Sequence, residues 1–380
     1  TDTMKRLATL LPAVAGFLLL LASCHSGSTS PTQTHGDTIS LKYARLITLI
    51  EQDSFNLVVM QNPWKPEKIL HRYVLVDKNQ PLPEQLPEGT VIRTPVERAV
   101  VYSSVHYSLL ELLQATDCVD GVCDAEYMLN PELQKKLQNG SVRNYGNSMS
   151  PNIEQIMEQH PEILMPSPFE QSGSYGKLGS LGIPIVECAD YMEGSALGRA
   201  EWMRFYGMLF GKEHQADSLF QSIEAEYNRL KKLAAGSRHK PSLLCEMKTG
   251  ANWFVPGGNS TSGQLYQDAG ARYVFAHLEN SGALPLPFEA VLEQAEDAEV
   301  WLIKYNQKEP LSYRQLKQDY EPYTRFKAWK DKHIYGCNTR YVPFYEETPF
   351  QPQLLLKDLI CLLHPDLLPG EKSRYFTPIP

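Results

Sequence analysis

The stretch PNIEQIMEQHPEILMPSP, residues 151–168, places a single carboxylate, Glu154, near the start of a short amphipathic segment that ends in an apolar run. The stretch PFEAVLEQAEDAEVWLIKY, residues 287–305, repeats this order with Glu289 in the corresponding place. Each copy predicts a helix followed by a buried strand. The repetition indicates two halves built on the same plan.

Length and composition agree with two lobes. The chain has 380 residues, 42% of them hydrophobic and 10% aromatic, which is more than one ordinary domain needs for its core. Its net charge of −8 argues against nucleic-acid binding, which requires a basic face.

Strand-like and helix-like segments alternate on both sides of a long helical stretch. RAVVYSS at 98–104 and PSLLCEM at 241–247 are apolar strand candidates, and helical patterns follow them. We expect a parallel α/β arrangement in each half, with a small antiparallel β element before the first. The expected boundaries are a signal peptide at 1–24, a flexible tether at 25–42, an N-terminal lobe with a β-hairpin extension at 43–194, a linking helix at 195–236 and a C-terminal lobe at 237–380. Gly207 and Gly211 are points where that helix can break.

The N-terminal stretch MKRLATLLPAVAGFLLLLASC has two cations, an apolar run and small residues before Cys24. The run is short for a membrane span and fits a signal peptide. The end of this stretch resembles the lipobox of bacterial lipoproteins, in which the cysteine is diacylated and becomes the mature N-terminus. An uncleaved anchor and an ordinary signal peptide are the alternatives.

Six cysteines follow Cys24. Cys118 and Cys123 flank a turn-rich tetrapeptide and either close a small disulfide or remain thiols; their spacing does not fit a CxxC metal or redox site. Cys188, Cys245, Cys337 and Cys361 lie in apolar contexts and are expected to be buried thiols.

The order of these segments resembles the periplasmic substrate-binding proteins of ABC importers for ferric siderophores, haem and cobalamin. NIEQI at 152–156 with PEIL at 161–164 is similar to one family segment, and FEAVL at 288–292 with DAEVWLI at 297–303 to its counterpart. The C-terminal stretch from Tyr345 resembles the form found in Bacteroidetes lipoproteins. The resemblance covers roughly residues 43–380 and implies two Rossmann-like lobes joined by one long helix, with the ligand in the cleft between them.

The resemblance also implies partners and a location. We expect a monomeric protein, lipid-anchored in the periplasm, that delivers its ligand to an ABC permease dimer with ATPase subunits, with an outer-membrane TonB-dependent receptor upstream. Family members use one exposed glutamate per lobe to meet permease arginines, and Glu154 and Glu289 occupy those positions. Stabilisation of a helix N-terminus is the other explanation for such carboxylates.

Loops after strands are the expected ligand-binding regions, because ligands of α/β proteins gather beyond the carboxyl ends of the strands. Aromatic and polar side chains in these loops suit a large planar or macrocyclic ligand, although many of them could instead belong to the core. The candidates are Ser104, His106, Tyr107, Phe169, Tyr175, Tyr191, Arg199, Trp202, Trp253, Gly257, Gly258, Arg340, Tyr341 and Tyr345.

Two other functions are alternatives to binding and transport. A hydrolase is unsupported, because Ser104 and His106 lie near each other but the GxSxG nucleophile motif is missing from the sequence. A metal-ion importer component is less favoured, because the ten histidines are scattered; His106 is the candidate for direct ligation of a metal or haem iron. We therefore expect no catalytic residues, no catalytic cofactor and no resident metal.

Overall fold

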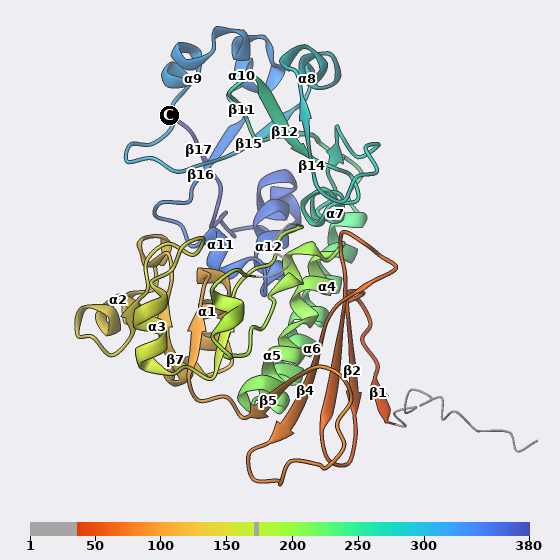
Figure 1. Cartoon of the computed structure of the whole chain (residues 1–380). Coiled ribbons are helices and arrows are strands. Elements are labelled where there is room, and N and C mark those ends of the chain that lie inside the picture. The colour runs from red at the N-terminus through yellow and green to blue at the C-terminus, as the bar shows by residue number, and fades with distance from the viewer. Residues whose placement is uncertain (1–35, 171–174) are drawn as a thin grey trace, which may run out of the picture. The chain divides into compact units, whose positions relative to one another are not determined.

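The computed structural model describes residues 36–170 and 175–380 (Figure 1). The signal peptide, the anchor at Cys24 and most of the tether lie outside the described residues. No helix among those described is both long and apolar enough to cross a membrane.

The N-terminal β element is a five-stranded sheet in the order β1-β2-β3-β4-β5. Neighbouring strands are antiparallel as predicted, except that β4 and β5 are parallel. A tight turn joins β2 and β3, where the amide of Gln52 donates to the carbonyl of Phe55 at 3.1 Å. The strands are β1 (Asp37–Ile39), β2 (Ile47–Glu51), β3 (Asn56–Gln61), β4 (Ile69–Asp77) and β5 (Thr90–Thr94).

The N-terminal lobe contains a parallel four-stranded sheet in the order β8-β7-β6-β9. The chain moves outward from β6 to β8 and then returns to pair β9 on the other side of β6. After residue 182 the chain adds one isolated parallel bridge to this sheet, between Leu164 and Ile185. The elements are β6 (Ala99–Val101), α1 (Ser104–Leu112), β7 (Val119–Val122), α2 (Pro131–Gln138), β8 (Arg143–Asn144), α3 (Ile153–Gln159) and β9 (Ile163–Met165).

The cysteines around β7 distinguish between the two alternatives that the sequence left open. Cys118 and Cys123 are both free thiols. Between them the chain forms β7, and an extended strand advances roughly 3.3 Å per residue, which carries the two residues farther apart than a disulfide can span. The four cysteines expected to be buried thiols are all buried and free.

The segment between the lobes forms three helices, α4 (Ala196–Glu201), α5 (Met203–Phe210) and α6 (Glu213–Ala235). The predicted single helix therefore breaks, at Trp202 and again at Gly211. Gly211 has a left-handed φ of 63°, which favours glycine and ends α5. Gly207 serves packing instead, since a Cβ there would lie 2.8 Å from the Cβ of Ala216 in α6.

The C-terminal lobe has a five-stranded sheet in the order β13-β10-β15-β16-β17, parallel except at β17, and a three-stranded sheet in the order β11-β12-β14. The repeated sequence forms α8 and β15 as predicted, and Phe288, Val291, Leu292 and Ala295 form the buried face of α8. The strands are β10 (Ser242–Cys245), β11 (Lys248–Thr249), β12 (Asn252–Pro256), β13 (Arg272–Tyr273), β14 (Ala283–Leu286), β15 (Val300–Tyr305), β16 (Ile334–Asn338) and β17 (Thr377–Pro378). The helices are α7 (Thr261–Asp268), α8 (Phe288–Ala295), α9 (Tyr313–Asp319), α10 (Lys327–Lys330), α11 (Phe344–Glu347) and α12 (Pro352–Leu363).

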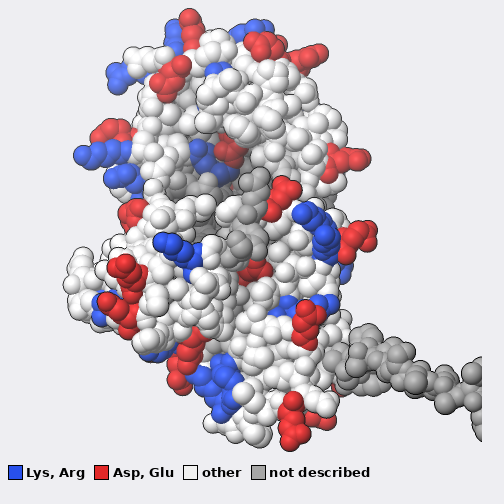
Figure 2. Space-filling view, in the orientation of Figure 1, with Lys and Arg blue, Asp and Glu red and all other residues white. Residues whose placement is uncertain are grey.

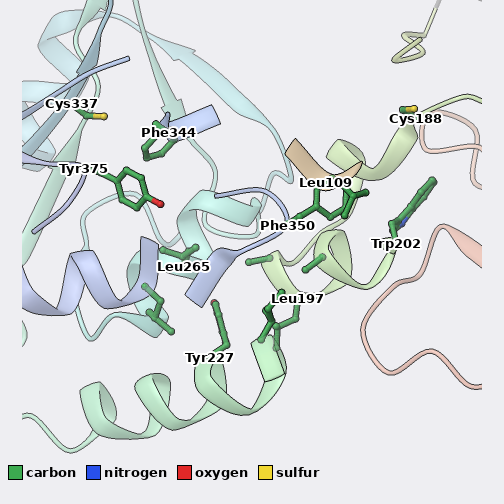
Figure 3. Packing of buried hydrophobic residues seen from close by; sticks show 14 of the residues in the cluster. Leu109, Cys188, Leu197, Trp202, Tyr227, Leu265, Cys337, Phe344, Phe350 and Tyr375 are labelled. Atoms are coloured by element: carbon green, nitrogen blue, oxygen red, sulfur yellow. The ribbon is translucent and has the colours of Figure 1, made fainter. Parts of the chain in front are cut away.

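One hydrophobic core runs through both lobes and the helices between them. Figure 3 shows members of this cluster from α1, α4, α6, α7 and α11 packed in one region. Two buried carboxylates attach the β element to the same region. Glu201 accepts the backbone amides of Lys42, Tyr43 and Ala44 at 2.7–2.9 Å, and Glu193 accepts those of Arg45 and Leu46. The β element is thus fixed to the start of the linking helices.

Candidate functional site

A cavity of about 310 Å³ lies between the lobes. The N-terminal side contributes Tyr191 and Arg199, and the C-terminal side contributes the start of α7, the end of β15 and helix α11. Figure 2 shows the surface hollowed between the two lobes, with mostly uncharged side chains around the hollow. Its position agrees with the rule that ligands of α/β proteins bind beyond the carboxyl ends of the strands.

One cation that lines this cavity, Lys304, belongs to an ion pair that the sequence pattern did not indicate. Lys304, near the end of β15, pairs with Glu246, which directly follows β10. Burial alone would lower the pKa of Lys304, but the carboxylate of Glu246 holds that pKa well above its usual value. Glu246 has a left-handed φ of 64°, an uncommon conformation for a residue with a side chain and one that is concentrated at functional sites. The neighbouring parallel strands β10 and β15 bring the pair together.

A second cation, Arg199, enters the cavity from α4 and is fixed by Asp190. Its Nε donates to Oδ2 of Asp190 at 2.9 Å, and Asp190 is completely buried. Oδ1 of Asp190 accepts the hydroxyl of Tyr206 at 2.9 Å and lies 2.7 Å from Nε2 of His106. Burial would raise the pKa of Asp190, but the charges of His106 and Arg199 lower it to about 2. The cavity thus has two cations, each neutralised by a carboxylate.

A second cavity, of about 590 Å³, shares Tyr345 with the first. The N-terminal lobe contributes Ser104 and the Glu126–Leu129 segment, and the C-terminal lobe contributes Asn306 and the segment from Thr339 to Glu346. Two of these lining residues join the lobes by a hydrogen bond, in which the amide of Leu129 donates to Oε1 of Glu346 at 2.6 Å. We refer to the two cavities together as the interlobe cleft.

The structure brings half of the predicted ligand-binding residues to this region. Tyr191, Arg199 and Tyr345 line the first cavity, and Ser104, Arg340, Tyr341 and Tyr345 line the second. Tyr107 is almost fully buried and borders an adjoining pocket that shares Ser104 and Tyr341 with the second cavity. Tyr341 and Tyr345 are 60% and 53% exposed, so both offer aromatic area to a ligand.

Several other predicted residues are placed away from the cleft, and three are core residues. Trp253 is fully buried against Trp301, and its Nε1 donates to the carbonyl of Cys245. Trp202 is fully buried and donates to Glu193. His106 is 2% exposed and lines neither cavity, so it is a partner of Asp190 and not a ligand of metal or haem iron. Sequence patterns do not separate such buried aromatics from binding residues, because burial depends on packing against distant segments.

The remaining predicted residues also lie elsewhere. Gly257 and Gly258 pack against the turn at 276–280, where a Cβ would lie 2.1 Å from Asn280 O and 2.0 Å from Ala276 O, respectively. Their neighbours Pro256 and Ser260 line the cleft instead. Tyr175 borders a groove beside the β element. Phe169 is 46% exposed and lines neither cavity of the cleft.

The two repeated carboxylates occupy matching positions outside the cleft. Glu154 is the second residue of α3 and Glu289 the second residue of α8. Both are exposed, and neither forms an ion pair with a described residue. The described residues contain no group of three or more His, Cys, Asp or Glu side chains that could hold a metal ion.

Known proteins with related sequences and structures point to one family. Residues 99–341, more than half of the chain, match the family described as periplasmic binding protein. An uncharacterized lipoprotein of Methanocaldococcus jannaschii is 26% identical over 373 residues, which cover 91% of this chain and 87% of that protein.

Two solved structures show the same fold at low sequence identity. An ABC-type Fe3+-hydroxamate transport protein of Saccharomonospora viridis has a TM-score of 0.55 at 17% identity, covering 71% of this chain and 94% of that one. A periplasmic heme binding protein of Pseudomonas aeruginosa has a TM-score of 0.57 at 17% identity, covering 73% and 96%.

The network around Asp190 gives a testable stability effect. Asp190→Asn leaves Arg199 and His106 without their buried counter-charge, so we expect the free energy of unfolding at pH 7 to fall by about 3–5 kcal/mol. The folded pKa of about 2 lies below the ordinary aspartate value, so this stabilisation is present above about pH 4 and is lost as the pH falls toward 2. Urea unfolding at neutral and acidic pH measures the difference from wild type.

The control for this experiment is Asp366→Asn, because Asp366 is exposed. We expect the control to change stability by less than about 0.5 kcal/mol. Equal stability of the two variants at pH 7 would show that the Asp190 network contributes nothing.

The matched segment, the two-lobed α/β fold and the cleft between the lobes lead to one identification: the chain belongs to the periplasmic binding protein family.

Proposed function

We propose that this protein is the lipid-anchored solute-binding component of an ABC importer and captures an iron complex, haem or cobalamin in the interlobe cleft. The observation that carries the proposal is a cleft lined by both lobes, with exposed tyrosines and two cations neutralised by carboxylates. Binding and delivery, and not catalysis, are the expected activity.

The cleft chemistry favours a large ligand with flat faces and hydrogen-bond acceptors. Tyr341 and Tyr345 offer aromatic area for stacking, and Arg199 and Lys304 offer charged donors. Glu246 and Asp190 balance those charges locally, so the site does not require a highly anionic ligand. Ligand sites of this kind commonly enclose about 300–1,000 Å³. The two cavities fall within that range.

Two solved structures with the same fold have names that suggest ligands to test. One is named as part of a Fe3+-hydroxamate transport system and another as a heme binding protein. At 17% identity they share the fold with this chain, and the ligand titration described below distinguishes ferric siderophore, haem and cobalamin.

A permease partner is proposed from the matched carboxylates. Glu154 and Glu289 are exposed at the same position of equivalent helices, one in each lobe. Charge-assisted pairs with arginines of a two-fold permease would fix both the orientation and the register of docking. In this proposal the N-terminal anchor at Cys24 keeps the protein at the periplasmic face of a membrane.

Ligand titration tests the cleft directly. The purified full chain is titrated with haemin, cyanocobalamin and a ferric hydroxamate in separate experiments, and the absorbance spectrum of each ligand is followed. We expect one of them to bind, and we expect Tyr345→Ala to weaken that binding by about 1–3 kcal/mol, the scale of an aromatic anchor. That loss corresponds to roughly a 5- to 150-fold higher Kd.

The matched control is Phe254→Ala. Phe254 is also an exposed aromatic of the C-terminal lobe, at 45%, but it lines neither cavity of the cleft. Its replacement is expected to leave the Kd unchanged. The proposal would be wrong if none of the three ligand classes bound, or if both variants bound like the wild type.

Transport assays test the docking pair. Glu154→Ala and Glu289→Ala should each weaken association with the permease by roughly 1.5–3 kcal/mol, the worth of a hydrogen bond to a charged group, while ligand affinity stays unchanged. The double variant should impair uptake most, in cells that contain the cognate importer. Glu→Gln should behave like Ala if the charge matters.

Glu293→Ala is a control within the second repeat, because Glu293 is exposed on α8 but lies one helical turn beyond Glu289. Normal uptake by the double variant would show that both carboxylates only stabilise the N-termini of their helices and do not bind the permease.

A further inference from the structure

A polar groove separate from the cleft lies between the β element and the N-terminal lobe. It has a volume of about 630 Å³. Strand β4 contributes His71, strand β5 contributes Thr90, and the segment after β9 contributes Tyr175 and Glu187. The groove therefore lies where the N-terminal addition meets the lobe.

A ring nitrogen of His71 and a carboxylate oxygen of Glu187 face each other at this groove, close enough for an ion pair when the imidazole is protonated. Nδ1 of His71 lies 3.3 Å from Oε2 of Glu187. Glu187 is only 6% exposed, and among the described residues no group makes a hydrogen bond to its Oε2, the imidazole of His71 included. A buried carboxylate oxygen without a hydrogen bond is costly, and its presence indicates a missing partner.

The outer atoms of both side chains are held in place. Nε2 of His71 is hydrogen-bonded to Oγ1 of Thr90 at 2.8 Å, and Oε1 of Glu187 accepts the hydroxyl of Tyr175 at 3.0 Å. The ring of Tyr73 stacks on His71 with centroids 4.4 Å apart, and its hydroxyl accepts the backbone amide of Glu187 at 2.9 Å. When Nε2 donates to Thr90, Nδ1 carries a lone pair, so two lone-pair atoms lie side by side.

The outer hydrogen bonds of these two side chains are the kind that position metal-binding side chains in proteins. A metal-bound histidine normally has its other ring nitrogen hydrogen-bonded, and a metal-bound carboxylate is likewise held by a second hydrogen bond. Zinc binds histidine nitrogen and carboxylate oxygen at about 2.0–2.2 Å in tetrahedral geometry, which places two such ligands roughly 3.3–3.5 Å apart. The separation of 3.3 Å between Nδ1 and Oε2 matches that value.

We propose that His71 and Glu187 bind a divalent transition-metal ion of the zinc type through Nδ1 and Oε2. The described residues supply only these two metal-ligating side chains here, so water molecules would complete the coordination. The volume of the groove leaves room for them. The ion would join β4 of the β element to the segment after β9 of the lobe. Thr90 and Tyr175 position the two ligands.

Calorimetric titration of ZnCl2 into the purified full chain tests the site. We expect saturable binding by the wild type and at least a tenfold weaker affinity for both His71→Gln and Glu187→Gln. Thr90→Val keeps the branched shape but removes the hydrogen bond to the imidazole, and it should weaken zinc binding by about 10- to 100-fold. Replacing zinc with cobalt gives an independent readout, since the visible absorption of Co2+ reports coordination by nitrogen and oxygen.

The matched control is His214→Gln, because His214 is exposed on α6, away from the groove. This variant should bind zinc like the wild type. Circular dichroism of each variant shows whether it is folded. If His71→Gln or Glu187→Gln is unfolded, the zinc affinity of Thr90→Val tests the proposal in its place. The proposal is wrong if the wild type does not bind zinc, or if His71→Gln or Glu187→Gln binds it with unchanged affinity.

Discussion

The buried carboxylate of Asp190 is the constraint on which the arrangement of the cleft depends. It receives bonds from α1 through His106, from α4 through Arg199 and from α5 through Tyr206. A fully buried carboxylate is stable only when opposite charges and hydrogen-bond donors surround it. Helices α1, α4 and α5 must therefore keep their positions relative to one another. The guanidinium of Arg199 reaches the cavity from this network with its direction already fixed.

The contacts between the lobes indicate that ligand binding requires little domain movement. The hydrophobic core is continuous from α1 through the linking helices to α11 and α12 (Figure 3). Polar contacts add to it, since Glu346 accepts the amide of Leu129 and the hydroxyl of Thr261 donates to the carbonyl of Glu193. Opening the cleft widely would expose this core, so we expect small adjustments at the loops rather than hinge closure.

The order of elements could be predicted from the sequence, because period and turn residues are local properties. The two repeats form α3–β9 and α8–β15, and the segments after β6 and β16 contribute Ser104, Tyr341 and Tyr345 to the cleft. Burial could not be predicted in the same way. Trp253 and Trp202 follow the same pattern as binding aromatics but are fully buried, and their indole nitrogens are satisfied by Cys245 and Glu193.

Other parts of the site depend on pairing between distant segments. In the sequence, Lys304 is one residue of a strand that is otherwise apolar. Its ion pair with Glu246 forms only because β10 pairs with β15 and places Glu246 beside it. His71 and Glu187 are far apart in sequence, and only the packing of the β element on the lobe brings them together. Patterns within one segment contain no information about such partners.

Hydrogen exchange of the full chain, with and without the bound iron complex, haem or cobalamin, tests the central claim most directly. Capture in the interlobe cleft predicts slower amide exchange on both sides of it, at residues 126–129 of the N-terminal lobe and at residues 260–266 and 339–346 of the C-terminal lobe. Exchange in strands β1–β3 should not change. Slower exchange confined to the β element, or to one lobe alone, would contradict binding between the lobes.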